Sequence, residues 1–191
     1  MKLEKEFYYR EDVVAIAKDL LGKSVFTHFD GMLTGGIITE TEAYEGVTDR
    51  ASHAYGGRKT SRTEIMFREG GTAYVYLCYG IHSLFNVVTN RPGIPHAVLI
   101  RAIKPETGME NMLKRTKKSF LDKHCGIGPG KVSSLLGIHF SHSGQILTGD
   151  TIWLEDTGHK IKSEIIVSKR VGVDYAKEDA LLPYRFIYPL L

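Results

Sequence analysis

The pattern of apolar and polar positions opens with one amphipathic segment, residues 12–21, whose spacing predicts a helix. Asp12 precedes the segment as a typical N-cap, and Gly22 follows it as a typical C-terminal stop. Strand-like runs come next at 23–29 and 32–43, and the dipeptide Asp-Gly between them is a common two-residue hairpin turn. The N-terminal part of the chain therefore predicts a helix followed by a β-hairpin.

Strand signals dominate the rest of the chain, after a polar loop at 44–63. A loop of this length inside a compact domain is usually functional or disordered, and we interpret this one as ordered. A helix opened by Pro105 is predicted over 105–118, and a shorter helix near Gly130. Further strands are predicted at 72–78, 81–89, 97–103, 151–155, 163–168 and 184–188. This mixture predicts an α+β fold: a single compact domain, residues 1–191, with a curved, largely antiparallel β-sheet core flanked by short helices.

The composition favours a soluble globular protein. Of its 191 residues, 42% are hydrophobic and 25% are charged, an ordinary balance for a folded domain. No segment reaches the roughly 18 consecutive apolar residues of a transmembrane helix, and the charged N-terminus does not resemble a signal peptide. The two cysteines do not make a disulfide framework, and Cys78, in an apolar run, is interpreted as a core residue. We therefore expect a cytoplasmic protein that makes no membrane contact.

The net charge of +3 is small, but its distribution is uneven. Residues 61–120 carry nine Lys/Arg against four Asp/Glu, whereas residues 1–60 carry eight against ten. A basic middle third is typical of a face that meets a phosphate backbone. A solvated surface helix at 114–118 would explain the same charges, so at this point both interpretations stand.

Two carboxylates and a tyrosine alternate at the end of a predicted strand. Side chains alternate along a strand, so Glu40, Glu42 and Tyr44 are expected on one face. The plainer interpretation is an exposed strand face. The alternative is hydrolysis, in which one carboxylate acts as a general base on a water molecule.

The polar loop contains His53, whose neutral ring can stack and form hydrogen bonds. An ordinary loop histidine is the plainer interpretation. No Cys, His or acidic partner stands at metal-ligand spacing from it, and nothing completes a set around His139 and His142. We expect neither a metal nor another cofactor.

Two further segments point to nucleic acid. A tyrosine at a turn, such as Tyr79, can wedge between bases, and a tyrosine on the adjoining strand face, such as Tyr76, can stack on one base. For Tyr74 we favour packing in the core. The glycine-rich segment 124–131, which ends in Lys131 before a predicted helix, resembles the hairpin of helix-hairpin-helix DNA-binding proteins. It would present backbone N–H groups to a phosphate.

A series of motifs runs in order along nearly the whole chain, at 39–44, 49–53, 56–62, 66–67, 71, 74–76, 79–80, 86–87, 99–102, 128–131, 153–154 and 170–173. This series resembles the alkyladenine (3-methyladenine) DNA glycosylase family. The resemblance implies a monofunctional enzyme of base excision repair. Its substrate would be double-stranded DNA that contains damaged purines, and its product an abasic site. It also implies a bacterial-type monomer that works without a cofactor.

The resemblance implies roles for the catalytic and base-binding residues. Glu42 matches the carboxylate that activates the attacking water, and Arg101 matches a basic residue near that carboxylate. Tyr44, His53 and Tyr76 match the residues that sandwich the flipped base. A base must leave the stack before its glycosidic bond can be reached, so these residues would form the receiving pocket.

The resemblance also implies how the DNA is held. Tyr79 matches the side chain inserted into the minor groove in place of the flipped base. Asn86 matches a pocket residue that disfavours the exocyclic amino group of normal guanine. We expect Arg58, Arg62 and Lys131 to contact DNA phosphates, with Lys59, Lys169 and Arg170 as further candidates.

Some questions stay open at this stage. The chain departs from the family pattern at Thr63 and Ile81, which bears on the range of lesions among 3-methyladenine, 7-methylguanine, hypoxanthine and etheno-adenine. One alternative is a helix-hairpin-helix glycosylase with Asp150 as its catalytic carboxylate. Another is a non-catalytic nucleic-acid-binding module. No lysine near Glu42 stands where the family uses one for a Schiff base, so we expect no strand cleavage.

Overall fold

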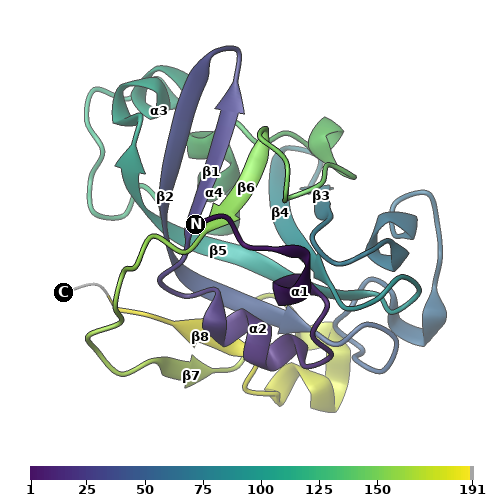
Figure 1. Ribbon diagram of the computed structural model, residues 1–191. Helices are drawn as coiled ribbons and strands as arrows, with labels where there is room; N and C mark the ends of the chain where they lie inside the picture. Colours follow the sequence, from purple (N-terminus) through teal and green to yellow (C-terminus); the bar gives the residue numbers. More distant parts are fainter. Residues whose placement is uncertain (190–191) are drawn as a thin grey trace.

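The long strand β2 (Met32–Tyr44) organises an eight-stranded sheet in the computed structural model, which describes residues 1–189 (Figure 1). The main path runs β3-β4-β5-β2-β1-β6, and β8 joins it beside β2 and also pairs with β7. All strand pairings are antiparallel. The other strands are β1 (Ser24–Phe29), β3 (Ala73–Cys78), β4 (His82–Thr89), β5 (His96–Thr107), β6 (Ile152–Glu155), β7 (Ile166–Ser168) and β8 (Arg185–Ile187).

The sheet curves because β2 changes partners along its length. Its first half pairs with β1 and its second half with β8, while β5 runs along its other edge. The register between β2 and β5 shifts on both sides of Glu40, and such irregularities bend a strand and re-aim its side chains. The resulting curled sheet with short helices confirms the predicted α+β fold class.

Two local predictions are confirmed at the N-terminal end. Helix α2 (Val13–Asp19) begins after Asp12, whose carboxylate accepts a hydrogen bond from the backbone N–H of Ala15 at 2.9 Å. The β1–β2 turn places both Asp30 and Gly31 at positive φ, as a type I′ hairpin requires. A further short helix, α1 (Lys5–Tyr8), was not predicted.

The prediction of a helix over 105–118 is wrong in its first part. Pro105 belongs to β5, where it pairs with Gly36 of β2, and α3 covers only Met109–Thr116. Gly108 separates the two elements in a left-handed conformation, and a Cβ there would lie 2.0 Å from the carbonyl oxygen of Leu33. Pairing with a distant strand extends β5, and local periodicity carries no sign of it.

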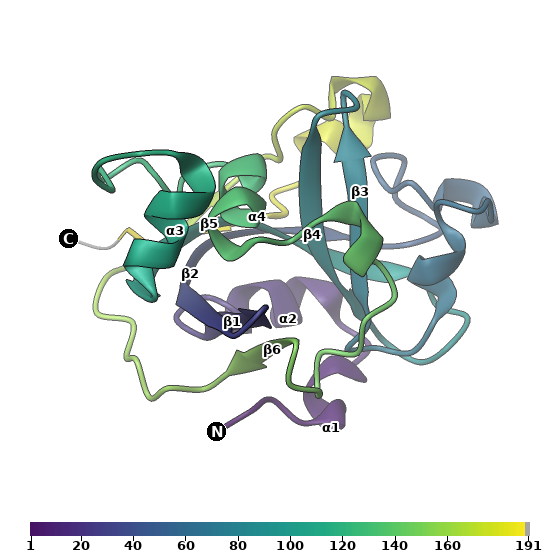
Figure 2. The ribbon, with the colours of Figure 1, turned by 90° about the horizontal axis from the view of Figure 1, so that it is seen from above.

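Helices cover the two faces of the sheet. Helix α2 packs on β2, and α4 (Pro129–Leu136) packs on β4 and β5 (Figures 1 and 2). Residues 1–189 also contain the 3-10 turns η1 (Tyr55–Gly57), η2 (Glu64–Phe67), η3 (Phe140–His142) and η4 (Asp174–Leu181). The main core includes Tyr8, Ile16, Phe85, Leu136 and Phe186, all fully buried. The loop at 44–63 is ordered, as predicted, and leads from β2 toward β3.

Residues 1–189 hold neither a candidate membrane span nor a candidate metal cluster. No helix there has the length and apolar character needed to cross a membrane. No three His, Cys, Asp or Glu side chains in the same range are grouped so that they could hold a metal ion.

Candidate active site

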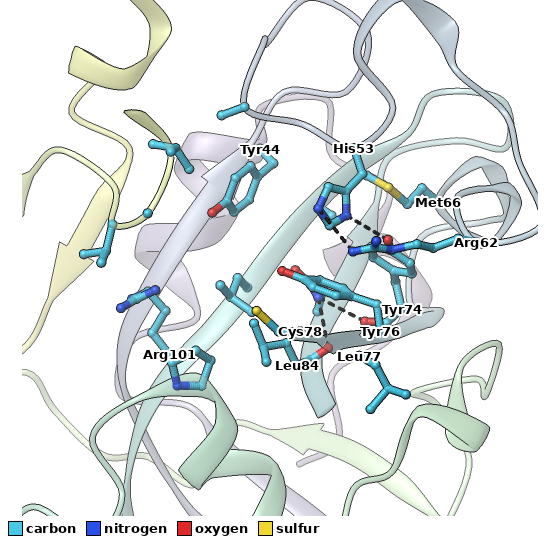
Figure 3. A pocket seen from close by; sticks show the side chains of 18 of the residues that line it. Tyr44, His53, Arg62, Met66, Tyr74, Tyr76, Leu77, Cys78, Leu84 and Arg101 are labelled. Atoms are coloured by element: carbon cyan, nitrogen blue, oxygen red, sulfur yellow. Dashed lines mark hydrogen bonds between the residues drawn. The ribbon is translucent and has the colours of Figure 1, made fainter. Parts of the chain in front are cut away.

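A cavity of about 460 Å³ opens between β2, β3, β4, β5 and the segment that follows β7. Figure 3 shows Tyr44 and Arg101 on one side of it and His53, Arg62 and Tyr76 on the other. The lining residues are Tyr44, Ala51, His53, Arg62, Met66, Tyr74, Tyr76, Leu77, Cys78, Tyr79, Leu84, Asn86, Ala97, Leu99, Arg101, Pro129, Val171, Gly172, Val173 and Tyr175. Cys78 is thus a half-buried lining residue, and the prediction of a core position for it is wrong.

Glu42 lies directly behind the cavity wall and is fully buried. Its Oε2 accepts a hydrogen bond from the hydroxyl of Tyr44, and its Oε1 accepts one from the backbone N–H of Val171, both at 2.8 Å. Arg101 approaches both carboxylate oxygens at 3.4 Å. Burial raises the pKa of Glu42, and the Arg101 charge and the two hydrogen bonds oppose that rise. A carboxylate held this way is a candidate general base.

Glu40 lies next to this site and is also buried. Its Oε1 accepts hydrogen bonds from Nε of Arg101 at 2.8 Å and from Nε of Arg185 at 2.6 Å. Glu40 and Glu42 therefore contact the same guanidinium and share one face of β2. The interpretation as an exposed strand face is wrong, because Glu40 and Glu42 are buried and the segment with Arg170 and Val171 packs on Tyr44 and Glu42.

The aromatic wall opposite Tyr44 is built from β3 and the long loop. The ring centroids of His53 and Tyr76 are 4.7 Å apart, and Nδ1 of His53 is 2.9 Å from the hydroxyl of Tyr74. Burial, with a smaller contribution from Arg62 and Arg58, lowers the pKa of His53 to about 4. The ring is consequently neutral at physiological pH, so His53 itself adds no positive charge to this wall. Tyr74 is buried, and its predicted core packing is confirmed.

Arg62 lines the cavity, a position that the phosphate prediction did not anticipate. Its guanidinium lies 4.7 Å from the ring centroid of Tyr76, and Nη2 is 3.5 Å from Nε2 of His53. Arg62 also lines a neighbouring cavity of about 460 Å³ together with Arg50 and Arg58. Three arginines around one hollow make that second cavity a candidate for an anion.

The turn between β3 and β4 carries the most exposed tyrosine. Tyr79 and Gly80 both have positive φ in the three-residue connection between Cys78 and His82, so the hairpin closes tightly. The side chain of Tyr79 is 92% exposed at the rim of the cavity, and its neighbour Ile81 is exposed as well. An aromatic ring held on a tight turn without packing partners has a geometry suited to insertion.

Asn86 lies on β4 across from Tyr74 and lines the cavity. Its Nδ2 donates to the carbonyl oxygens of Tyr74 at 3.1 Å and Leu84 at 3.3 Å. These two bonds hold the Asn86 side chain in a fixed orientation in the cavity wall.

The remaining basic candidates divide into exposed and buried groups. Arg58 and Lys131 are exposed, and Lys131 stands in α4 with its Nζ bonded to the carbonyl oxygen of His124 at 3.2 Å. Arg170 is buried and forms a double hydrogen bond with the buried Asp49. The prediction that Arg170 contacts a phosphate is therefore wrong, because a side chain enclosed in this pair does not reach solvent.

Several contacts of the site were not predicted from the sequence, although residues 170–173 belong to the motif series. Arg170 lies over the ring of Tyr44 at 4.8 Å, and the next residue, Val171, supplies the N–H bonded to Glu42. Tyr175 lines both cavities and donates to the carbonyl oxygen of Ala51. These contacts join segments more than 100 residues apart, so the local pattern did not indicate which residues meet.

The interpretation with Asp150 as the catalytic carboxylate is wrong. The Asp150 side chain is 96% exposed and pairs with Lys2, outside the residues that line the cavity. The sheet-rich fold also differs from the mostly helical helix-hairpin-helix proteins.

The fold, together with a family match over nearly the whole chain, defines a DNA glycosylase, an enzyme that hydrolyses the N-glycosyl bond of a base in DNA. A family model described as methylpurine-DNA glycosylase matches residues 6–189. The chain belongs to the methylpurine-DNA glycosylase family. This membership also excludes the interpretation as a non-catalytic binding module.

Bacterial relatives match over nearly their full length. The chain is 46% identical to a protein of Chlamydia felis (strain Fe/C-56), over 97% of this chain and 95% of that protein. Identity is 44% to a protein of Chlamydia pneumoniae, over 97% and 94%, and 44% to one of Clostridium acetobutylicum, over 97% and 93%. All three carry the name "Putative 3-methyladenine DNA glycosylase".

Proposed function

We propose that the protein flips a damaged purine out of duplex DNA into the aromatic cavity and cuts its glycosidic bond with a water activated by Glu42. The observation that carries this proposal is the position of Glu42. It is fully buried, yet all three of its hydrogen-bonding partners, Tyr44, Arg101 and Val171, line the cavity. A sugar placed at that wall would meet a carboxylate and its orienting groups together.

The chemistry follows from the charge that develops on the sugar. As the base leaves, the sugar becomes an oxocarbenium-like cation, and the nearby Glu42 carboxylate stabilises it electrostatically. Glu42 then accepts a proton from the water that attacks the anomeric carbon, and Arg101 orients the carboxylate. The product is an abasic site. No lysine lines the cavity, which supports hydrolysis without a Schiff base or strand cleavage.

The cavity suits a flat, positively charged base. Tyr44 faces His53 and Tyr76 across the space, so a purine would stack between electron-rich rings (Figure 3). Cation–π attraction would add about 1 kcal/mol for an N3- or N7-alkylated purine. Such purines already carry a positive charge and leave without a general acid. We propose the class of 3-methyladenine, 7-methylguanine, hypoxanthine and etheno-adenine, of which the last two are neutral and need a proton on the leaving purine. Asn86 would act against the amino group of normal guanine.

The exposed groups around the cavity would hold the DNA. We propose that Tyr79 inserts into the minor groove and fills the gap left by the flipped nucleotide. Arg58 and Lys131 are exposed and can meet phosphates, and Arg62 can turn outward toward the second, arginine-lined cavity. We expect one protein molecule per lesion.

The test uses a DNA duplex with a single 7-methylguanine, followed by alkaline treatment that converts abasic sites to breaks. Wild-type protein should produce the break, and Glu42→Gln should bind the duplex with similar affinity but release no base. Glu45→Gln is the matched control, because Glu45 is exposed, three residues away and outside the cavity lining. Full activity of Glu42→Gln would refute the proposed mechanism.

A further inference from the structure

Glu40 is a buried carboxylate that the proposed reaction leaves without a role. It accepts from Arg101 on β5 and from Arg185 on β8, so two strands on opposite edges of β2 meet at one oxygen atom. The register of β2 shifts on both sides of Glu40. The irregularity in β2 turns the Glu40 carboxylate toward Arg101, and the hydrogen bond between them fixes the position of Arg101.

The distances show how Arg101 is held. Its Nε lies 2.8 Å from Glu40, whereas its contacts with Glu42 are 3.4 Å. An unrestrained arginine and carboxylate pair closely through two parallel hydrogen bonds of about 2.7–2.9 Å. Arg101 does not do this with Glu42, because its Nε is already committed to Glu40. The catalytic carboxylate therefore has an arginine beside it without being fully neutralised by it.

We propose that Glu40 is a positioning residue: it holds Arg101 back from a close two-bond pair with Glu42 and so keeps Glu42 basic enough to activate water. Arg185 also donates to Glu40, beside Arg101, and balances its negative charge. This inference rests on the proposed role of Glu42 as general base.

The charges around Glu42 fix the direction of the expected effect. Arg101 of β5 faces it, as do Glu40 and Tyr44 of β2, and Arg185 is its cross-strand neighbour on β8. Arg170 and Tyr175 approach from the C-terminal segment. The negative charge of Glu40 raises the pKa of Glu42, and the charge of Arg101 lowers it. Removing Glu40 deletes the first effect and lets Arg101 move closer, so both changes lower the pKa of Glu42.

The test measures single-turnover excision of 7-methylguanine from duplex DNA across a pH series, with Glu40→Gln as the first variant. This base is already cationic, so the rate falls at acid pH as Glu42 becomes protonated. The acid limb of the pH–rate profile is the range in which the rate falls as the pH drops. We expect this limb to lie at lower pH in Glu40→Gln than in the wild type. We also expect the maximal rate to fall by about 100-fold, because an arginine displaced by roughly 1 Å disturbs the reacting geometry. Duplex affinity should stay within twofold.

Two companion variants separate positioning from mere structural support. Arg185→Gln leaves the charge of Glu40 unbalanced, so its acid limb should move to higher pH, opposite to Glu40→Gln. Glu40→Asp keeps the charge with a shorter reach and should restore part of the rate. If Glu40 only supports the fold, Glu40→Gln and Arg185→Gln should give less active protein with a lower melting temperature. The acid limb of their pH–rate profiles should then stay where it is in the wild type.

Each outcome has one meaning. Opposite shifts of the acid limb in Glu40→Gln and Arg185→Gln support the proposal. An unshifted limb in both variants overturns it, provided that Glu42→Gln is inactive, and in that case the proposed function stands. Activity in Glu42→Gln would instead refute the proposed function. If Glu40→Gln does not fold, Arg185→Gln decides alone: a shift to higher pH supports the proposal, and no shift overturns it.

Discussion

The buried pair of Asp49 and Arg170 gives the sharpest prediction about stability. Neither side chain reaches solvent. The Asp49 carboxylate also accepts from the backbone N–H groups of Ala51 and Glu45. Arg170 donates in addition to the carbonyl oxygens of Ala43 and Asp179. Asp49→Asn would leave a buried guanidinium without a counter-charge at the point where the long loop meets the C-terminal segment.

The loss of folding free energy caused by Asp49→Asn can be estimated from these contacts. Removing one partner of a buried ion pair typically costs about 3–5 kcal/mol. With an m-value of about 2 kcal/mol per molar urea, a loss of about 4 kcal/mol lowers the unfolding midpoint by roughly 2 M. Equilibrium unfolding in urea, followed by circular dichroism, measures this shift. The double variant Asp49→Asn with Arg170→Met removes the unpaired charge and should recover part of the loss.

The matched control is the exposed pair of Lys104 and Glu106, whose nitrogen and oxygen lie 3.4 Å apart. Lys104→Gln should cause no resolvable change, because exposed ion pairs are screened by solvent. A loss below about 1 kcal/mol for Asp49→Asn, with an unchanged m-value, would show that the buried charge is tolerated and that the reasoning is wrong.

Two further predictions concern the hairpin tip and the aromatic wall. Tyr79→Ala should leave stability unchanged because the side chain is 92% exposed, but it should slow excision from duplex DNA more than from a single strand; equal losses on both substrates would argue against a wedge. For His53, burial first and then Arg62 and Arg58 lower the pKa to about 4. The unfolded chain therefore binds more protons between pH 6.5 and 4, and stability should fall as the pH drops through that window. His53→Asn should flatten this dependence in urea titrations at pH 7 and pH 5, and an unchanged slope would assign it to another group.

Features that depend on neighbouring residues could be predicted from the sequence. Features that depend on pairing between segments far apart in the chain could not. The turns at Asp30-Gly31 and Tyr79-Gly80 follow from residues that accept positive φ, and the structure has both. The extension of β5 to Thr107 depends on its pairing with β2, so Pro105 was misread as a helix start. Arg170 looked like a phosphate ligand because its buried partner, Asp49, is 121 residues away in the chain.

The candidate site shows the same division. The family pattern identified Glu42, Tyr44 and Arg101, which the fold brings together. It did not identify Glu40 as a partner of Arg101, because that contact depends on an irregularity in β2 that only the sheet register reveals. Buried polar networks are assembled in three dimensions, and each member looks like an ordinary surface residue when read alone.

The β3–β4 hairpin has a consequence for how DNA is surveyed. Strand β3 carries Tyr76, which lines the cavity, and the turn that follows the strand carries the exposed ring of Tyr79, three positions further on. At about 3.3 Å per residue, the backbone positions of Tyr76 and Tyr79 lie at most roughly 10 Å apart, joined by the paired end of β3 and a tight turn. If the Tyr79 ring inserts into the duplex, the cavity wall at Tyr76 moves with it. Each insertion would then present to the cavity one nucleotide at a fixed distance from the inserted ring. The hairpin would then set the distance between the inserted ring and the cavity. Lengthening its turn by a single residue would change that distance and misplace the nucleotide relative to the cavity.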